Sequence, residues 1–177
     1  CDNARIGRDI VRLLIDAGYR RLALVRGDPK VMTGVERTDA IQASVAASKH
    51  TRVVADRTDC LGYAAGRRAI AELWQADDRP DAVICSSDPT ALGILDGARR
   101  DLHIDVPGDL AVVGLGDIPQ AGWAAYGLTT VHLPIDEMIE LAVQDLLSRL
   151  SDAEQGPRPM KAHASIVRRE SVRTGNA

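Results

Sequence analysis

The stretch Asp81-Ala82-Val83-Ile84-Cys85-Ser86-Ser87-Asp88-Pro89-Thr90-Ala91-Leu92-Gly93 decides the fold class. It contains a short, continuously apolar run at residues 82–85, which is typical of a strand buried on both faces. Two serines then form a polar turn, and Asp88 is suited to cap a helix that has Pro89 in its first turn. A buried strand that leads directly into a helix indicates an α/β protein with a mostly parallel sheet.

The same alternation continues on both sides of this stretch. Further apolar runs predict strands at residues 22–25, 53–54, 110–113, 129–133 and 164–167, and helical spacing predicts helices at residues 6–17, 33–47, 61–74, 89–100 and 135–150. Gly18 follows the first of these helices in the position of a left-handed cap. We expect an irregular crossover at residues 118–127 and a polar loop at residues 151–159. The predicted fold is a doubly wound, mostly parallel sheet with helices on both faces.

Composition narrows the classes of function. The 177 residues suffice for one domain, and 22 basic against 25 acidic residues give a net charge of −3, which disfavours nucleic-acid binding by this chain alone. The sequence contains no apolar run long enough to cross a bilayer, so no membrane partner is expected. Its three cysteines are widely spaced, which disfavours a disulfide framework or a metal site and fits a reducing cytoplasm.

Polar residues follow several of the predicted strands. In an open parallel sheet, ligands bind beyond the carboxyl ends of the strands, where the loops 27–37, 56–61, 85–90 and 114–120 are expected. Carboxylates accept hydrogen bonds from paired hydroxyls and arginine donates in a planar fork, so these loops suit a sugar or another hydroxyl-rich or anionic small molecule. Their polar candidates, with two residues that precede the first helix, are Asp2, Asn3, Asp28, Thr33, Arg37, Asp59, Ser86, Ser87, Asp88 and Asp117.

Several separated motifs resemble the effector-binding core of the lactose/galactose repressor family of bacterial transcription regulators. They are the opening stretch, Val106-Pro107-Gly108-Asp109-Leu110-Ala111-Val112-Val113-Gly114, Leu128-Thr129-Thr130-Val131 and Ser165-Ile166-Val167-Arg168-Arg169-Glu170-Ser171. The resemblance implies a periplasmic-binding-protein-like effector domain, in which two subdomains are joined by crossing strands. Residues of about 18–117 would form the C-terminal subdomain, and residues of about 118–177 the crossover and returning elements. Most of the N-terminal subdomain and the DNA-binding helix-turn-helix head would lie outside this chain.

The resemblance also implies which residues contact the effector. Arg37, ten residues after Gly27, matches the family's effector-clamping arginine, and Gly116 replaces the first carboxylate of an Asp-Asp pair. The full set of implied effector contacts is Asp2, Thr33, Arg37, Leu61, Ser87, Asp88 and Asp117. Purely structural roles remain open: Asp88 as a helix cap, Asp117 as a support for its turn, and Arg37 as a surface residue of its helix.

A homodimer is a further implication of the resemblance. The helix at 89–100 carries apolar residues on more than one side, namely Leu92, Ile94, Leu95 and Ala98. If one side packs on the sheet, the others predict a dimer interface. The alternative is a helix buried on both sides within one chain.

The expected function is ligand sensing and dimerisation in a cytoplasmic bacterial transcription regulator. Its effector would be a small molecule, a sugar or a related polar metabolite, and it would reach operator DNA only through the head outside this chain. The alternative is an extracytoplasmic sugar-binding protein of the same fold, but the closing stretch 165–171 favours the regulator. Scattered histidines, and the lack of a nucleophile elbow or phosphate-binding loop, disfavour an enzyme. No cofactor or metal is expected.

Overall fold

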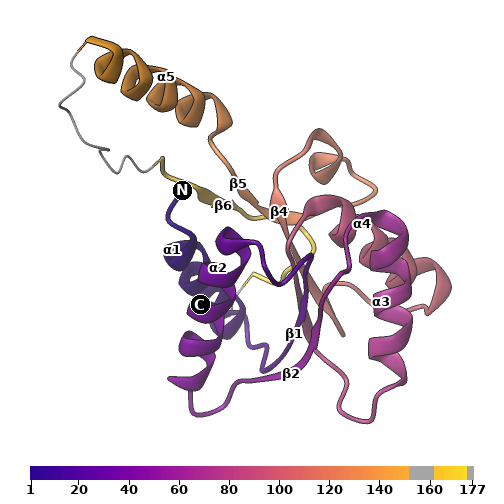
Figure 1. Cartoon of the computed structure of the whole chain (residues 1–177). Coiled ribbons are helices and arrows are strands. Elements are labelled where there is room, and N and C mark those ends of the chain that lie inside the picture. The colour runs from indigo at the N-terminus through magenta and orange to yellow at the C-terminus, as the bar shows by residue number, and fades with distance from the viewer. Residues whose placement is uncertain (152–161, 175–177) are drawn as a thin grey trace.

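Six strands form one sheet in the computed structural model, which describes residues 1–151 and 162–174 (Figure 1). The strand order is β2-β1-β3-β4-β5-β6, in which β1 to β5 pair in parallel and β6 runs antiparallel to β5. Every predicted strand overlaps an observed one. The strands are β1 (Arg21–Val25), β2 (Arg52–Arg57), β3 (Ala82–Cys85), β4 (Ala111–Gly116), β5 (Thr129–His132) and β6 (Ser165–Val167).

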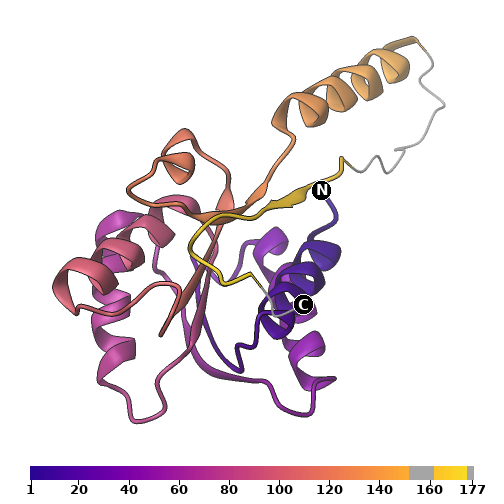
Figure 2. The ribbon, with the colours of Figure 1, turned by 180° about the vertical axis from the view of Figure 1, so that it is seen from behind.

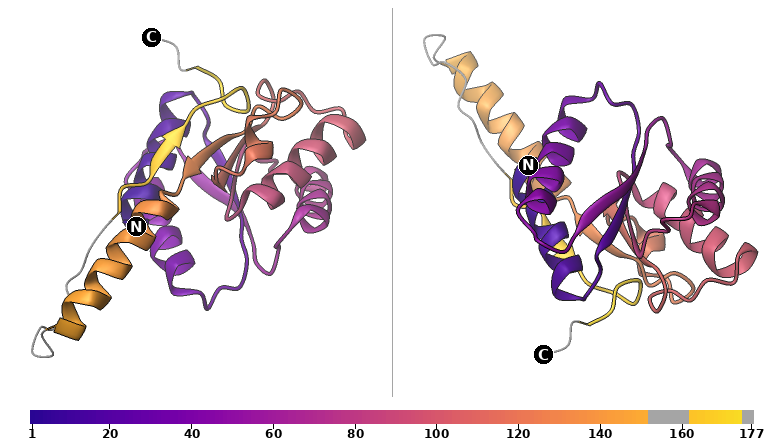
Figure 3. Two further views of the ribbon diagram at one scale, coloured as in Figure 1. Left: turned by 90° about the horizontal axis from the view of Figure 1, so that it is seen from above. Right: turned by 90° about the horizontal axis from the view of Figure 1, so that it is seen from below.

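Helices cover both faces of the sheet, as the alternating pattern predicts. One face carries α1 (Asn3–Asp16) and α2 (Met32–Ala46), and the other carries α3 (Tyr63–Gln75) and α4 (Asp88–Asp96) (Figure 2). A π-helical turn (Gly97–Asp101) extends α4, and the crossover contains a short 3-10 helix (Pro119–Gly122). The last helix, α5 (Ile135–Ser151), extends away from this body (Figure 3). The polar loop predicted after it falls, from residue 152, outside the described residues.

The core is divided in two by the sheet. Successive residues of a strand point to opposite faces, so Leu22 and Leu24 pack with α1 and α2, whereas Ala23 and Val25 pack with α3 and α4. All four side chains are essentially inaccessible to solvent. This double burial explains why the strands are continuously apolar in the sequence.

The predicted capping residue is observed at the end of α1 but not at the start of α4. Gly18 adopts a φ of +92°, its N–H donates to the Ile15 carbonyl, and the N–H of Tyr19 donates to the Leu14 carbonyl, as a left-handed cap requires. At α4, however, Ser87 occupies the cap position and Asp88 is the first helical residue. The prediction that Asp88 caps the helix is therefore wrong.

Helix α4 is buried on both sides within a single chain. Its four apolar residues Leu92, Ile94, Leu95 and Ala98 are 6%, 0%, 0% and 0% exposed. They contact the core between the sheet and α3, which crosses α4 so closely that a Cβ on Gly93 would lie 2.0 Å from the Tyr63 carbonyl oxygen. These residues are consequently core residues, and their assignment to a dimer interface is corrected.

Three separate segments meet at the base of α5: the N-terminus, the end of β5 and the segment before β6 (Figures 1 and 2). The Cys1 thiol lies 3.4 Å from the Met138 sulfur, which joins the first segment to α5. After β6 the chain returns to the sheet, where the Ser171 hydroxyl donates to the Val112 carbonyl and accepts the Thr129 N–H. No described helix is both long and apolar enough to cross a membrane.

Candidate functional site

A cavity of about 360 Å³ lies beyond the carboxyl ends of β1 and β3, at the edge where the sheet topology predicts a ligand. The loops after these two strands form part of its wall, together with the start of α1, the first two turns of α2 and the base of α5. Of the seven predicted effector contacts, the structure brings Thr33, Arg37 and Leu61 together here. The neighbouring candidates Asn3, Asp28 and Ser86 line the same cavity.

Arg37 carries an incompletely satisfied guanidinium. One terminal nitrogen donates to the Asn3 side-chain oxygen at 2.8 Å, and the Asn3 amide in turn donates to Glu36 at 3.2 Å. The Nε of Arg37 is buried without a hydrogen-bond partner among the described residues. Burial lowers the pKa of Arg37, but an arginine keeps its charge at neutral pH. The site thus holds a cation whose protein partner is a neutral amide.

The other charged groups of the wall are already paired or bonded. Arg26 forms two hydrogen bonds with Asp56, at 2.7 and 2.8 Å, and these bonds raise the pKa of Arg26. Asp28 accepts the N–H of Lys30 at 2.8 Å. The Ser86 hydroxyl accepts the N–H of Gly27 at 3.2 Å, so its own proton is left to donate.

Much of the remaining wall is apolar and open to solvent. Val31, Leu61 and Met138 are 53%, 61% and 37% exposed. Leu61 packs against Gly27 so closely that a Cβ there would lie 2.8 Å from the Leu61 side chain. A ligand that covers these groups would remove apolar surface from water, which favours binding.

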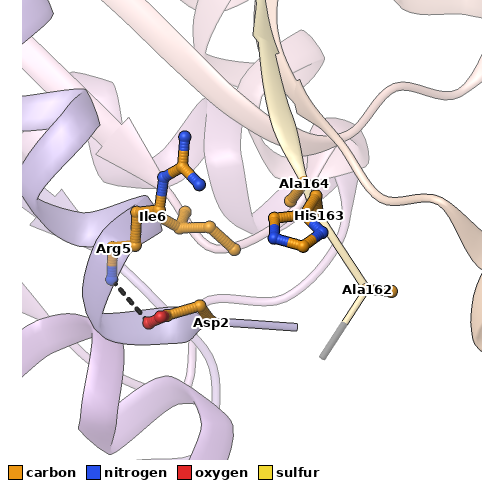
Figure 4. Close-up of a pocket in the computed structure, with 6 residues that line it drawn as sticks. All are labelled: Asp2, Arg5, Ile6, Ala162, His163 and Ala164. Carbon is orange, nitrogen blue, oxygen red and sulfur yellow. Dashed lines mark hydrogen bonds between the residues drawn. The ribbon is translucent and has the colours of Figure 1, made fainter. Parts of the chain in front are cut away.

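Asp2 lies at a different place from the one predicted. Its carboxylate accepts the N–H of Arg5 at 2.9 Å and thereby caps α1 (Figure 4). It borders a smaller hollow of about 40 Å³, next to Ile6 and His163, instead of the large cavity.

Asp88 and Asp117 also fall outside the cavity wall. Asp88 is completely buried, and its two oxygens accept the N–H of Ile118 at 2.9 Å and the hydroxyl of Thr130 at 2.5 Å. Asp117, at a φ of +57°, contacts Arg169 at 2.7 Å and His132 at 3.2 Å. These carboxylates join the crossover to the body, and the direct effector contacts predicted for them stay predictions.

Ser87 is not among the residues that line the cavity, whereas its neighbour Ser86 is. The Ser87 hydroxyl lies 2.9 Å from that of Thr90. The cavity is also lined by three residues that were not among the predicted contacts, namely Arg26, Leu133 and Met138. Arg26 directly follows a predicted strand and was identifiable from that position, whereas Met138 lies on a helix whose placement no local pattern reveals.

Among the described residues, no group of acidic, histidine or cysteine side chains is arranged to hold a metal ion.

Comparison with known proteins gives a consistent result. Residues 11–172 match the periplasmic binding protein-like domain family. The chain is 29% identical over 169 residues to the HTH-type transcriptional repressor PurR of Shigella dysenteriae, covering 93% of this chain and 48% of that protein. It is 29% identical over 180 residues to PurR of Proteus mirabilis, covering 98% and 51%. The chain thus spans about half the length of these curated relatives.

Solved structures agree with the sequence matches. A LacI family transcriptional regulator from Lactobacillus casei with bound sucrose superposes with a TM-score of 0.83 at 29% identity, covering 97% of this chain and 64% of that one. A putative regulator from Bacillus cereus subsp. cytotoxis, at 20% identity, has the same fold with a TM-score of 0.89, covering 99% and 62%. These relatives are regulators, in agreement with the expectation of a binding protein over an enzyme. The chain belongs to the periplasmic binding protein-like domain family.

Proposed function

We propose that this chain is the ligand-sensing part of a cytoplasmic bacterial transcription regulator. A small molecule would bind in the cavity at the carboxyl edge of the sheet, in contact with Thr33, Arg37 and Leu61. Binding would alter the arrangement of the crossover segments, and through them the DNA affinity of a helix-turn-helix head outside these 177 residues. The net charge of −3 supports the assignment of DNA binding to another part of the protein.

The observation that carries this proposal is the environment of Arg37, a cation that lines the cavity. Its Nε is buried and has no hydrogen-bond partner among the described residues. A buried polar group without a hydrogen-bond partner destabilises the fold. Such groups are therefore retained mainly where a function requires them. The crossover carboxylates contribute indirectly: Asp88 bonds to Ile118 and Thr130, and Asp117 pairs with Arg169. We assign them to the positioning of the crossover.

A thermal-shift screen of sugars, polyols, nucleosides and small organic acids tests the proposal. A ligand at one hundred times its dissociation constant adds about 2.7 kcal/mol to the free energy of unfolding. The matched control is Arg37→Ala, for which the same ligand is expected to give a smaller shift. A stabilising compound that acts equally on both proteins would place its site outside this cavity.

We also propose that the regulator is a homodimer, since a dimer presents two DNA-reading heads at a fixed spacing. The residues buried in α4 take no part in this proposal. Sedimentation of the chain at micromolar concentration tests it directly. A monomer at that concentration would contradict dimerisation through this part of the protein.

A further inference from the structure

One cation of the large cavity has no ion-pair partner among the described residues. Arg26 is neutralised by Asp56, but Arg37 has no carboxylate within ion-pair distance among the described residues. Among the described residues of the wall, Asp28 is the acidic one, and it is exposed with an oxygen that accepts the N–H of Lys30. Arg37 is therefore a cation of the wall that is left without an ion-pair partner among the described residues.

The polar groups beside Arg37 are donors as well. The Ser86 hydroxyl has a free proton, because its oxygen already accepts the N–H of Gly27. Helix α2 begins at the wall, where Val31 in the cap position offers no side-chain oxygen to the first amide groups. These amides carry the positive end of the helix dipole. A guanidinium, a hydroxyl proton and a helix amino end all favour a ligand with acceptor oxygens and negative charge.

The rest of the wall offers little to a polyol. Sugars are held by acceptors for their many hydroxyl protons and by aromatic faces, and none of the described residues that line this cavity is aromatic. Six of them are apolar instead: Cys1, Val31, Leu61, Leu115, Leu133 and Met138. An apolar ligand body would cover the exposed side chains of Leu61 and Val31.

We propose that the ligand of this cavity is an organic anion with an apolar body, such as an aliphatic carboxylate, in preference to an uncharged sugar. The carboxylate accepts hydrogen bonds from Arg37 and Ser86, and the carbon chain lies on Leu61, Leu115 and Met138. This inference rests on the proposed effector function and specifies its ligand class.

Matched probes that differ only in charge test the inference. The probes are hexanoate with hexanamide and octanoate with octanamide, and their dissociation constants are measured by calorimetry on the whole chain. Each carboxylate is expected to bind at least about tenfold more tightly than its amide, as a charge-assisted bond to a partly buried arginine allows. Added salt is expected to narrow the difference only slightly, because Arg37 is shielded from solvent.

Substitutions locate the preference. Arg37→Gln is expected to bring the two members of each pair within about twofold of each other, while Arg37→Lys keeps part of the difference. Arg12→Gln is the control, since Arg12 is exposed on α1 and pairs with Asp16 four residues on. Circular dichroism and thermal unfolding of every variant verify that it remains folded.

The possible results separate the two levels of the proposal. Equal affinity for carboxylate and amide, or a preference that survives Arg37→Gln in a folded protein, would overturn the anion inference. Glucose and sucrose serve as uncharged comparison ligands. If a sugar binds in an Arg37-dependent manner and the carboxylates do not, the ligand class is wrong and the effector function stands. If neither the acids nor the sugars bind, the anion inference is overturned, and the wider thermal-shift screen decides the effector function separately.

Discussion

The guanidinium of Arg37 is held in position, but its hydrogen bonds are incomplete among the described residues. Asn3 holds one end of its guanidinium, which leaves the cation in place but without a compensating charge. We therefore expect Arg37→Ala to weaken binding of the cognate ligand by about 1.5–3 kcal/mol, the range for a hydrogen bond to a charged group. Calorimetry measures the change, with Arg12→Ala as the exposed control. Unchanged affinity in the Arg37 variant would remove this residue from the site.

Asp88 has a structural task that can be separated from binding. Its carboxylate satisfies the N–H of Ile118 and the hydroxyl of Thr130 in a region closed to solvent. Asp88→Ala leaves these donors unpaired, so the free energy of unfolding is expected to fall by about 2–3 kcal/mol, as measured by urea denaturation. Asp109→Ala, at an exposed position, is expected to change it by less than about 0.5 kcal/mol. A stable Asp88→Ala protein with abolished binding would instead restore Asp88 as an effector contact.

The same residues show how far a site can be predicted from sequence. Arg37, Thr33 and Leu61 line the cavity, and each lies in a loop, or near the start of a helix, that follows a strand, which is why their position could be predicted. The partners of Asp88 are 30 and 42 residues away, and no local pattern specifies them. A carboxylate after a strand is equally suited to a ligand and to a buried N–H, so only the tertiary structure distinguishes these roles.

Helix α4 illustrates the same limit at the level of an element. Its apolar content was recognised, but the second surface that covers it is α3, whose backbone approaches through small residues. A Cβ on Gly66 would lie 2.1 Å from the Thr90 carbonyl oxygen, and a Cβ on Gly93 2.0 Å from that of Tyr63. Glycines within predicted helices indicate such a close crossing. Glycine destabilises a helix interior, so its presence there suggests that a neighbouring backbone needs the space.

Replacement of Ile94 distinguishes a core helix from an interface helix. Ile94 is completely buried inside the chain, so Ile94→Ala is expected to lower the free energy of unfolding by about 2–5 kcal/mol through lost contacts and a residual cavity. The loss should be independent of protein concentration, and sedimentation of the folded variant should match the wild type. A variant of normal stability that changes its association state would return Ile94 to an interface.

At the scale of the whole molecule, the topology was predictable and the position of α5 was not. Alternating strand and helix patterns specify the parallel sheet, and the sheet edge specifies the cavity. Helix α5 follows Pro134 and extends away from the body (Figure 1). Its position depends on the direction that the chain takes between β5 and the helix. Periodicity reports which side of a helix is apolar but gives no information about what covers it.

The apolar stripe of α5 is exposed along its length, at the spacing of one helix face. Ile135, Ile139, Val143, Leu146 and Leu150 are each between 48% and 75% exposed. Contiguous apolar surface of this kind binds hydrophobic dyes and promotes association. We expect the chain to enhance the fluorescence of anilinonaphthalene sulfonate in its native state, and we expect Ile139→Ser combined with Leu146→Ser to remove most of the signal.

The control for this prediction is Trp123→Ser, which removes a 55% exposed aromatic side chain outside α5 and should leave most of the dye signal. Because the substituted α5 residues are exposed, the double variant is expected to change the free energy of unfolding by less than about 1 kcal/mol. A larger loss of stability, with weak dye binding by the wild type, would mean that α5 packs against the body in solution. In that case the stripe belongs to the core, and the helix does not project as it does in Figure 2.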